Sequence, residues 1–167
     1  MSLTLRNALL NLVYYGLTVV LFPWTLLSLE TYFGFVRHHS TVLRIGSVLF
    51  GVAGAALQLW SIFVFQSIGR GTPSPALAPE RLVTKGPYKR VRNPMNIGEL
   101  MVFLALGGWF GSPLLLGYTV VAALAFHSFI VVWEEPQLLG RFGKAHIQYR
   151  ASVNRWLPRL ASKAIQS

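Results

Sequence analysis

The sequence contains neither cysteine nor aspartate, and only 12% of its 167 residues are charged. The lack of cysteine excludes disulfide bonds, thiolate metal sites and a cysteine nucleophile. The lack of aspartate leaves five glutamates as the only acidic side chains, so each can be considered individually. No spacing typical of metal ligands occurs, and His38 and His39 have no acidic partner nearby, so we expect no metal site.

The charge that is present is strongly basic and unevenly placed. Fifteen Lys and Arg residues oppose five glutamates, giving a net charge of +10 in a chain that is 53% hydrophobic. A disordered basic tail would be polar, and a soluble nucleic-acid-binding protein would spread its charge over a solvated surface. Here the cations lie between long uncharged runs. We therefore expect one membrane domain over residues 1–167 and no nucleic-acid partner.

Two uncharged runs in the N-terminal part predict transmembrane helices. Residues 7–29 and 45–69 carry no charge, and each run can cross about 30 Å of hydrocarbon at about 1.5 Å per residue. The first run is longer than a signal-peptide core. We interpret it as a retained helix that bends at Pro23.

A third uncharged run, residues 100–133, is too long for one straight span. Its 34 residues would extend about 51 Å as one helix. Glycine and proline cluster between Gly107 and Pro113, and such clusters mark turns. We therefore predict a tight hairpin with arms over residues 94–110 and 114–133, which gives four transmembrane helices in total.

The cations predict the orientation of these helices. With four helices, the N-terminus, the connection after the second helix and the C-terminal tail share one side of the membrane. Thirteen of the cations fall on that side and two, Arg37 and Arg44, on the other; an excess of Lys and Arg marks the cytoplasmic side. We expect an all-α, polytopic integral membrane protein with both termini in the cytoplasm. After Pro136, apolar residues recur every three or four positions, which predicts an amphipathic tail helix.

The hairpin also predicts where polar side chains meet, because both arms open at the cytoplasmic face. Residues 88–99 should therefore approach residues 134–135. Asn93 is a good N-cap, and Pro94 suits the first helical position. The two residues mark either a helix start alone or an anion site as well. Free N–H groups at a helix N-terminus bind carboxylates, and Arg92 would add a charged donor.

Glu99 is a carboxylate inside a predicted membrane helix, which costs about 3 kcal/mol at the bilayer centre and less near the interface. It shares a helix face with Met95 and Asn96. The residue either forms an ion pair with Arg92 or Lys89 or contacts a ligand.

Glu134 and Glu135 close the predicted second arm, where carboxylates oppose the helix dipole. They either pair with nearby cations or bind hydroxyl groups or a cationic ligand. His127 lies two turns deeper on the same face as Glu134. It serves either as a hydrogen-bond partner between helices or as a ligand-binding or catalytic residue.

Four motifs follow one another in the C-terminal half: Gly86-Pro87-Tyr88, Arg92-Asn93-Pro94-Met95 with Gly98, Glu134-Glu135, and a tail segment from Phe142-Gly143 through Tyr149 to Pro158. In this order they resemble the integral-membrane methyltransferases, which include isoprenylcysteine carboxyl methyltransferase and phospholipid N-methyltransferases. The resemblance covers residues 69–158 and implies that S-adenosylmethionine binds beside the helical hairpin at the cytoplasmic side. The cofactor contacts that it implies are Tyr88, Arg92, Asn93, Pro94, Met95, Glu134 and Glu135.

Three positions depart from the pattern of these enzymes. Asn93 stands where the isoprenylcysteine branch has histidine, whereas phospholipid methyltransferases tend towards Asn-Pro-Met. Asn96 and His146 stand where tyrosine is common. These changes argue against isoprenylcysteine as the acceptor.

The residues and the resemblance together predict a membrane methyltransferase that transfers the methyl group of S-adenosylmethionine to a lipid or lipophilic small acceptor. Residues 1–66 would form two N-terminal helices, and residues 67–160 the cofactor-binding core. An amine acceptor must lose a proton, for which Glu99 and His127 are the candidate catalytic bases. The alternative is a non-enzymatic membrane protein that binds anionic lipid or scaffolds partners through its basic tail. A small transporter is less favoured, because the sequence has no internal repeat.

Overall fold

The computed structural model describes residues 9, 12–38, 40–69 and 79–159, and these parts form helices joined by turns and irregular segments, without a β-strand. Three helical segments are long and apolar enough to cross a membrane, namely Leu12–Tyr32, Thr41–Gly69 and Pro113–Ser152, and Pro94–Phe110 is a shorter apolar helix. This confirms the predicted all-α membrane fold with a C-terminal hairpin.

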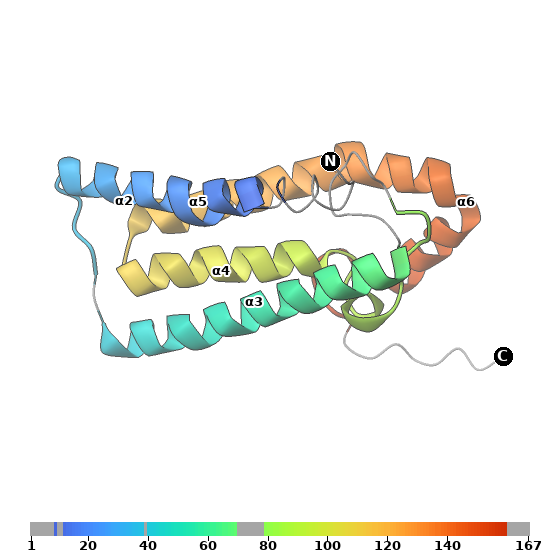
Figure 1. Ribbon diagram of the computed structural model, residues 1–167, viewed down its shortest axis with the longest axis horizontal. Coiled ribbons are helices and arrows are strands. Elements are labelled where there is room, and N and C mark those ends of the chain that lie inside the picture. Colours follow the sequence, from blue (N-terminus) through green and yellow to red (C-terminus); the bar gives the residue numbers. More distant parts are fainter. Residues whose placement is uncertain (1–8, 10–11, 39, 70–78, 160–167) are drawn as a thin grey trace. The chain divides into compact units, whose positions relative to one another are not determined.

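The named elements in chain order are η1 (Gly16–Leu21), α2 (Phe22–Tyr32), α3 (Thr41–Gly69), η3 (Gly86–Lys89), α4 (Pro94–Phe110), α5 (Pro113–Phe129), η4 (Ile130–Glu134) and α6 (Glu135–Ser152) (Figure 1). They divide into two compact units. The first unit comprises residues 1–56 and 98–127, and the second comprises residues 57–97 and 128–167.

Glycines on α3 bring α4 close to it in the first unit, where the two helices lie side by side (Figure 1). A Cβ atom placed on Gly54 would lie 2.6 Å from the Met101 Cβ and 2.8 Å from the Gly98 carbonyl oxygen. One on Gly51 would lie 3.0 Å from the Ala105 Cβ. Small residues allow such close backbone approach between membrane helices, so this packing depends on glycine at position 54.

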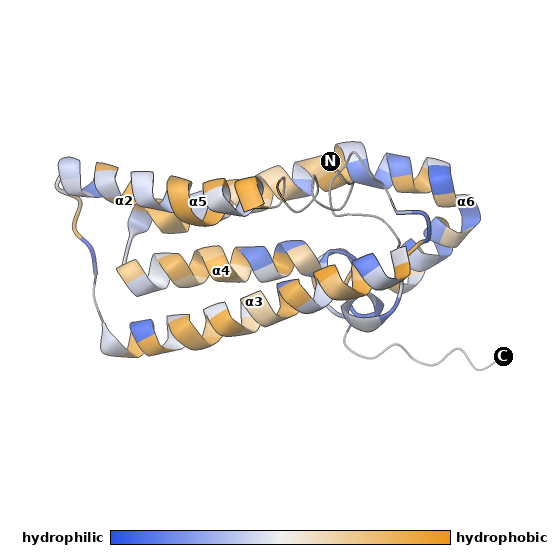
Figure 2. Cartoon of the chain, in the orientation of Figure 1, coloured by the Kyte–Doolittle hydropathy of each residue, from blue (hydrophilic) through white to orange (hydrophobic). Residues whose placement is uncertain are grey.

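Hydrophobic residues cover the helices of the first unit, and many of them are exposed (Figure 2). Val42, Leu49 and Val52 of α3 and Val120 and Leu124 of α5 are examples with large exposed fractions. Exposed apolar surface of this extent is unfavourable in water but suits hydrocarbon. The first unit therefore presents a surface made for lipid.

The predicted hairpin is present, and its first arm has the predicted bounds. Gly111 has φ +59°, and a Cβ atom there would collide with the His38 backbone carbonyl, so the turn requires glycine. The Ser112 hydroxyl then accepts a hydrogen bond of 3.0 Å from the Leu115 amide, which caps the start of α5.

The predicted end of the second arm at Trp133 was wrong, because the helical path continues through η4 and α6 to Ser152. The Glu135 amide bonds to the Ile130 carbonyl in a wider π-helical turn. Pro136 follows directly in the first turn of α6, and a local π-helical adjustment of this kind lets a helix accommodate a proline. The helix therefore does not end at the glutamate pair, and the expected opposition to a helix C-terminal dipole does not arise. A break does occur at Gly143, which has φ 49°.

Pro23 likewise lies in the first turn of α2, so the helical path passes through it without a stop. The irregularity of the first helix is instead the π-helical segment η1, which ends two residues earlier, at Leu21. The predicted bend at the proline is thus replaced by a change of helix type just before it.

Glu30 connects α2 to the start of α5 within the first unit. Its carboxylate is fully buried and accepts hydrogen bonds from the Ser112 hydroxyl at 2.5 Å and the Leu114 amide at 2.8 Å. The Arg37 Nε donates to its other oxygen at 3.0 Å. A buried charge with a cation and a helix N-terminus around it is compensated, so Glu30 has a structural role.

The contact at Gly54 gives a testable prediction. In Gly54→Ala the new methyl group must push α4 away, and such overpacking costs about 1–3 kcal/mol. The matched control is Gly46→Ala on the same helix, where a Cβ meets nothing within 4 Å. We expect thermal unfolding in detergent to show a lower Tm for Gly54→Ala alone. Equal Tm values for the two variants would contradict the close packing of α3 and α4.

Candidate functional site

The Gly86-Pro87-Tyr88 motif packs against the end of α3 in the second unit. Gly86 has φ +59°, and a Cβ atom there would lie 3.1 Å from a Val64 methyl group. The Tyr88 ring lies 6.3 Å from the Phe65 ring, and the Tyr149 hydroxyl donates a 2.8 Å hydrogen bond to the Tyr88 carbonyl. Burial, together with the neighbouring Tyr149 and Glu134, raises the pKa of Tyr88 above its ordinary value, so its phenol stays neutral.

Glu135 is the centre of a buried ion-pair cluster in the second unit. Arg92 donates from Nη1 to Oε1 at 2.6 Å, and Arg155 donates through Nε at 2.9 Å and Nη2 at 3.0 Å. Arg150 Nη2 lies 3.4 Å from Oε2. Three guanidinium groups thus surround one carboxylate, and this cluster (Arg92, Glu135, Arg150 and Arg155) retains an excess of positive charge.

The backbone holds Arg92 in this position. Its amide donates a 2.9 Å hydrogen bond to the Asn154 carbonyl, and Val91 pairs with Asn154 in an isolated parallel bridge. The segment before α4 is therefore joined to the C-terminal tail both through the backbone and through Glu135.

Asn93 and Pro94 start α4 as the sequence predicts. The Asn93 carbonyl accepts a 3.2 Å hydrogen bond from the Ile97 amide, and Pro94 is the first helical residue. Both side chains are buried. Met95 in the first turn is half-buried. The Arg92-Asn93-Pro94 motif therefore presents a helix N-terminus next to the cluster at Glu135.

His146 on α6 was noted in the sequence only as a departure from tyrosine, but the structure buries it to 1% exposure. It interacts electrostatically with Arg150, Glu135 and Arg92. The sequence contained a sign of this position, since His146 lies three residues before Tyr149. The Tyr149 side chain is buried, and this spacing places both residues on one face of α6.

Four buried side-chain atoms in the described parts of the chain have no hydrogen-bond partner: Arg92 Nε, Asn93 Nδ2, and both ring nitrogens of His146. All four belong to the second unit. Native proteins leave few buried polar atoms unpaired, and an unpaired one requires an explanation. Three of these residues supply N–H donors and the imidazole also supplies an acceptor, a set that suits a ligand with a carboxylate.

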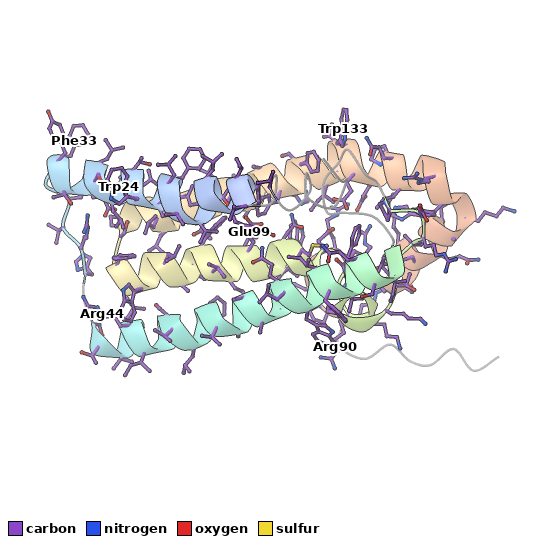
Figure 3. The ribbon with its side chains drawn as sticks, in the orientation of Figure 1. Trp24, Phe33, Arg44, Arg90, Glu99 and Trp133 are labelled. Carbon is purple, nitrogen blue, oxygen red and sulfur yellow. The ribbon has the colours of Figure 1, made fainter. Side chains whose placement is uncertain are left out.

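Glu134 and Trp133 adjoin Glu135 in the second unit. Glu134, in η4, interacts electrostatically with Glu135 and Arg92. Trp133 beside it is 53% exposed, and its side chain points outward (Figure 3). Glu134 therefore belongs to the same charged neighbourhood, whereas the Trp133 ring does not cover it.

Glu99 and His127 both lie in the first unit. Glu99 is 6% exposed and lies on the side of α4 next to the N-terminal helix (Figure 3). It accepts a 2.9 Å hydrogen bond from the Tyr14 hydroxyl and interacts with Thr18. The ion pair considered for it with Arg92 is replaced by these hydroxyl contacts, because Arg92 pairs with Glu135. His127 is exposed on α5.

The fold and site thus define a polytopic helical membrane protein with a buried cationic cluster beside a helix N-terminus. The model of the phospholipid methyltransferase family matches residues 41–145 of the chain. The protein belongs to this family of membrane methyltransferases. No curated protein matches the chain in a direct sequence comparison.

The ion-pair cluster gives a second prediction. Glu135→Gln removes the carboxylate that compensates three guanidinium groups, two of which are at least three-quarters buried. We expect a loss of about 3 kcal/mol in the free energy of unfolding, because an unpaired buried charge is costly. The matched control is Glu80→Gln, at an exposed glutamate. Chemical unfolding in detergent compares the two variants, and equal stability would show that Glu135 does not hold the cluster together.

Proposed function

We propose that this protein transfers a methyl group from S-adenosylmethionine to a lipid or lipophilic small acceptor at the cytoplasmic interface of the membrane. The family membership supports methyl transfer. The observation that carries the choice of methyl donor is the set of unpaired buried donors at Arg92, Asn93 and His146. When bound, S-adenosylmethionine supplies a sulfonium-activated methyl group.

The chain's own residues would bind and orient this donor. Arg92 uses Nη1 for Glu135, which leaves its Nε–H for a ligand carboxylate. The Asn93 amide and the free N–H groups at the start of α4 add further donors. Because arginines already occupy Glu135, Glu134 is the better candidate for accepting ribose hydroxyls. Tyr88, Pro94 and Met95 would line the site, and positioning of this kind supplies much of the rate of a displacement reaction.

The acceptor is a membrane lipid or lipophilic molecule in this proposal. The exposed apolar surface of the first unit indicates that the protein lies among lipids. The distribution of Lys and Arg supports an orientation in which both termini, the segment before α4 and the C-terminal tail lie on the cytoplasmic side. For an amine acceptor, Glu99 is the preferred proton acceptor because it is a buried carboxylate among hydroxyl groups, and His127 is the other candidate.

Binding of the methyl donor is tested by calorimetry on the purified full-length protein. Arg92→Lys keeps a cation for Glu135 but removes the Nε–H donor, so we expect at least a tenfold loss of affinity for S-adenosylmethionine, as for loss of a charged hydrogen bond. The control is Arg90→Lys, at an exposed residue of the same segment (Figure 3). No binding by the folded wild-type protein would rule out the proposed donor. Transfer of labelled methyl groups into membrane extracts would then identify the acceptor.

The same methyl-transfer assay tests which residue accepts the proton, after an amine substrate has been identified. We expect Glu99→Gln to lower the rate about 10² to 10⁴-fold while affinity for S-adenosylhomocysteine stays unchanged. Glu80→Gln again serves as the control for loss of one carboxylate. If His127→Gln loses methyl transfer while Glu99→Gln remains active, His127 is instead the residue that accepts the proton.

A further inference from the structure

The imidazole of His146 is the least explained group in the second unit. Its residue is 1% exposed, yet neither ring nitrogen has a hydrogen-bond partner. A buried neutral imidazole has one N–H donor and one acceptor nitrogen. Leaving both unpaired is costly, so the position makes physical sense only when something else supplies the partners.

The neighbouring Glu135 does not supply them. Its two oxygens already receive hydrogen bonds from Arg92 and Arg155, and Arg150 lies 3.4 Å from one of them. His146 interacts electrostatically with both Arg92 and Arg150. These cations disfavour a second positive charge on the imidazole. His146 therefore acts as a neutral ring, and its acceptor nitrogen can take a hydrogen bond from a ligand donor.

The hydrogen-bond donors and acceptors on these unpaired side chains indicate which chemical groups the ligand must carry. Arg92 Nε–H and the Asn93 amide offer donors only, which match a carboxylate or a phosphate. A phosphate has no N–H to offer the acceptor nitrogen of a neutral imidazole. An α-amino acid group has both parts, since its carboxylate accepts hydrogen bonds and its ammonium donates them. It therefore offers an acceptor to Arg92 and Asn93 and a donor to the acceptor nitrogen of His146, whereas a phosphate group alone offers only the acceptor.

We propose that His146 binds the α-amino acid end of the methyl donor, accepting a hydrogen bond from its ammonium group. Arg92 and Asn93 donate to the carboxylate of the same group. His146 is then a cofactor-binding residue contributed by the tail, beyond residues 41–145 that the family match covers. This inference rests on the proposed function, because it assigns one end of the donor proposed there.

Calorimetry on the full-length protein with two ligands tests the assignment. S-adenosylhomocysteine carries the amino acid group, whereas 5′-methylthioadenosine lacks it and keeps the nucleoside. We expect His146→Leu to lose at least tenfold in affinity for S-adenosylhomocysteine and less than twofold for 5′-methylthioadenosine. His146→Gln keeps a donor and an acceptor and should recover most of the loss. His38→Leu, at an exposed histidine, is the control.

The possible outcomes separate the inference from the function on which it rests. If the wild-type protein binds neither ligand, the proposed function is wrong. If the wild-type protein binds both ligands and His146→Leu binds S-adenosylhomocysteine with unchanged affinity, the proposed role of His146 is wrong. The role is also wrong if His146→Leu loses affinity for both ligands equally while its Tm is unchanged. If His146→Leu binds phosphatidylglycerol vesicles more weakly than the wild-type protein but keeps its affinity for S-adenosylhomocysteine, the unpaired atoms bind a lipid phosphate, and the proposal is overturned. If His146→Leu does not fold, His146→Phe removes the same polar atoms and is held to the same outcomes.

Discussion

A carboxylate that leaves water needs positive charge around it, and Glu135 has three guanidinium groups. These come from two separate stretches of the chain, with Arg92 located 43 residues before Glu135 and Arg155 20 residues after it. The ion pair thereby determines where the start of α4 lies relative to the tail within the second unit. It also determines which edge of Arg92 is used, and so leaves Nε–H as the donor without a partner.

The two buried acids of the first unit, Glu30 and Glu99, have different partners. Glu30 has a cation, a hydroxyl and a backbone amide as partners, so nothing about it requires a ligand. Glu99 has hydroxyl contacts but no cation among the partners described above. A carboxylate held in this way can exchange a proton without breaking an ion pair, which is what a base for an amine acceptor needs. Glu30 and Glu99 are both buried, so burial alone does not distinguish them.

Hydrophobic runs and turn residues predicted the spans well, because a bilayer imposes length and polarity directly on the sequence. The uncharged run of residues 45–69 became α3, and the glycine and proline cluster became the turn at Gly111. The end of the second arm was not predictable, since a π-helical turn carries no clear sequence pattern and allows the helix to pass Pro136. The helix start at Asn93 and Pro94 was predictable, because local capping rules apply there. Adjacent glutamates cannot be told apart by spacing, and His146 required the tertiary contacts of α6.

The basic excess therefore has two separate roles. Most cations lie on one predicted side of the membrane, where they bias topology. Arg150 and Arg155 come from the same basic tail but are engaged with the buried Glu135. A tail whose arginines hold a buried carboxylate is not a free basic arm, which weakens the interpretation of the protein as a lipid-binding scaffold. The tail is instead joined to the start of α4 through Glu135 and through the Arg92 amide, and its exposed Arg141 and Lys144 remain for the membrane surface.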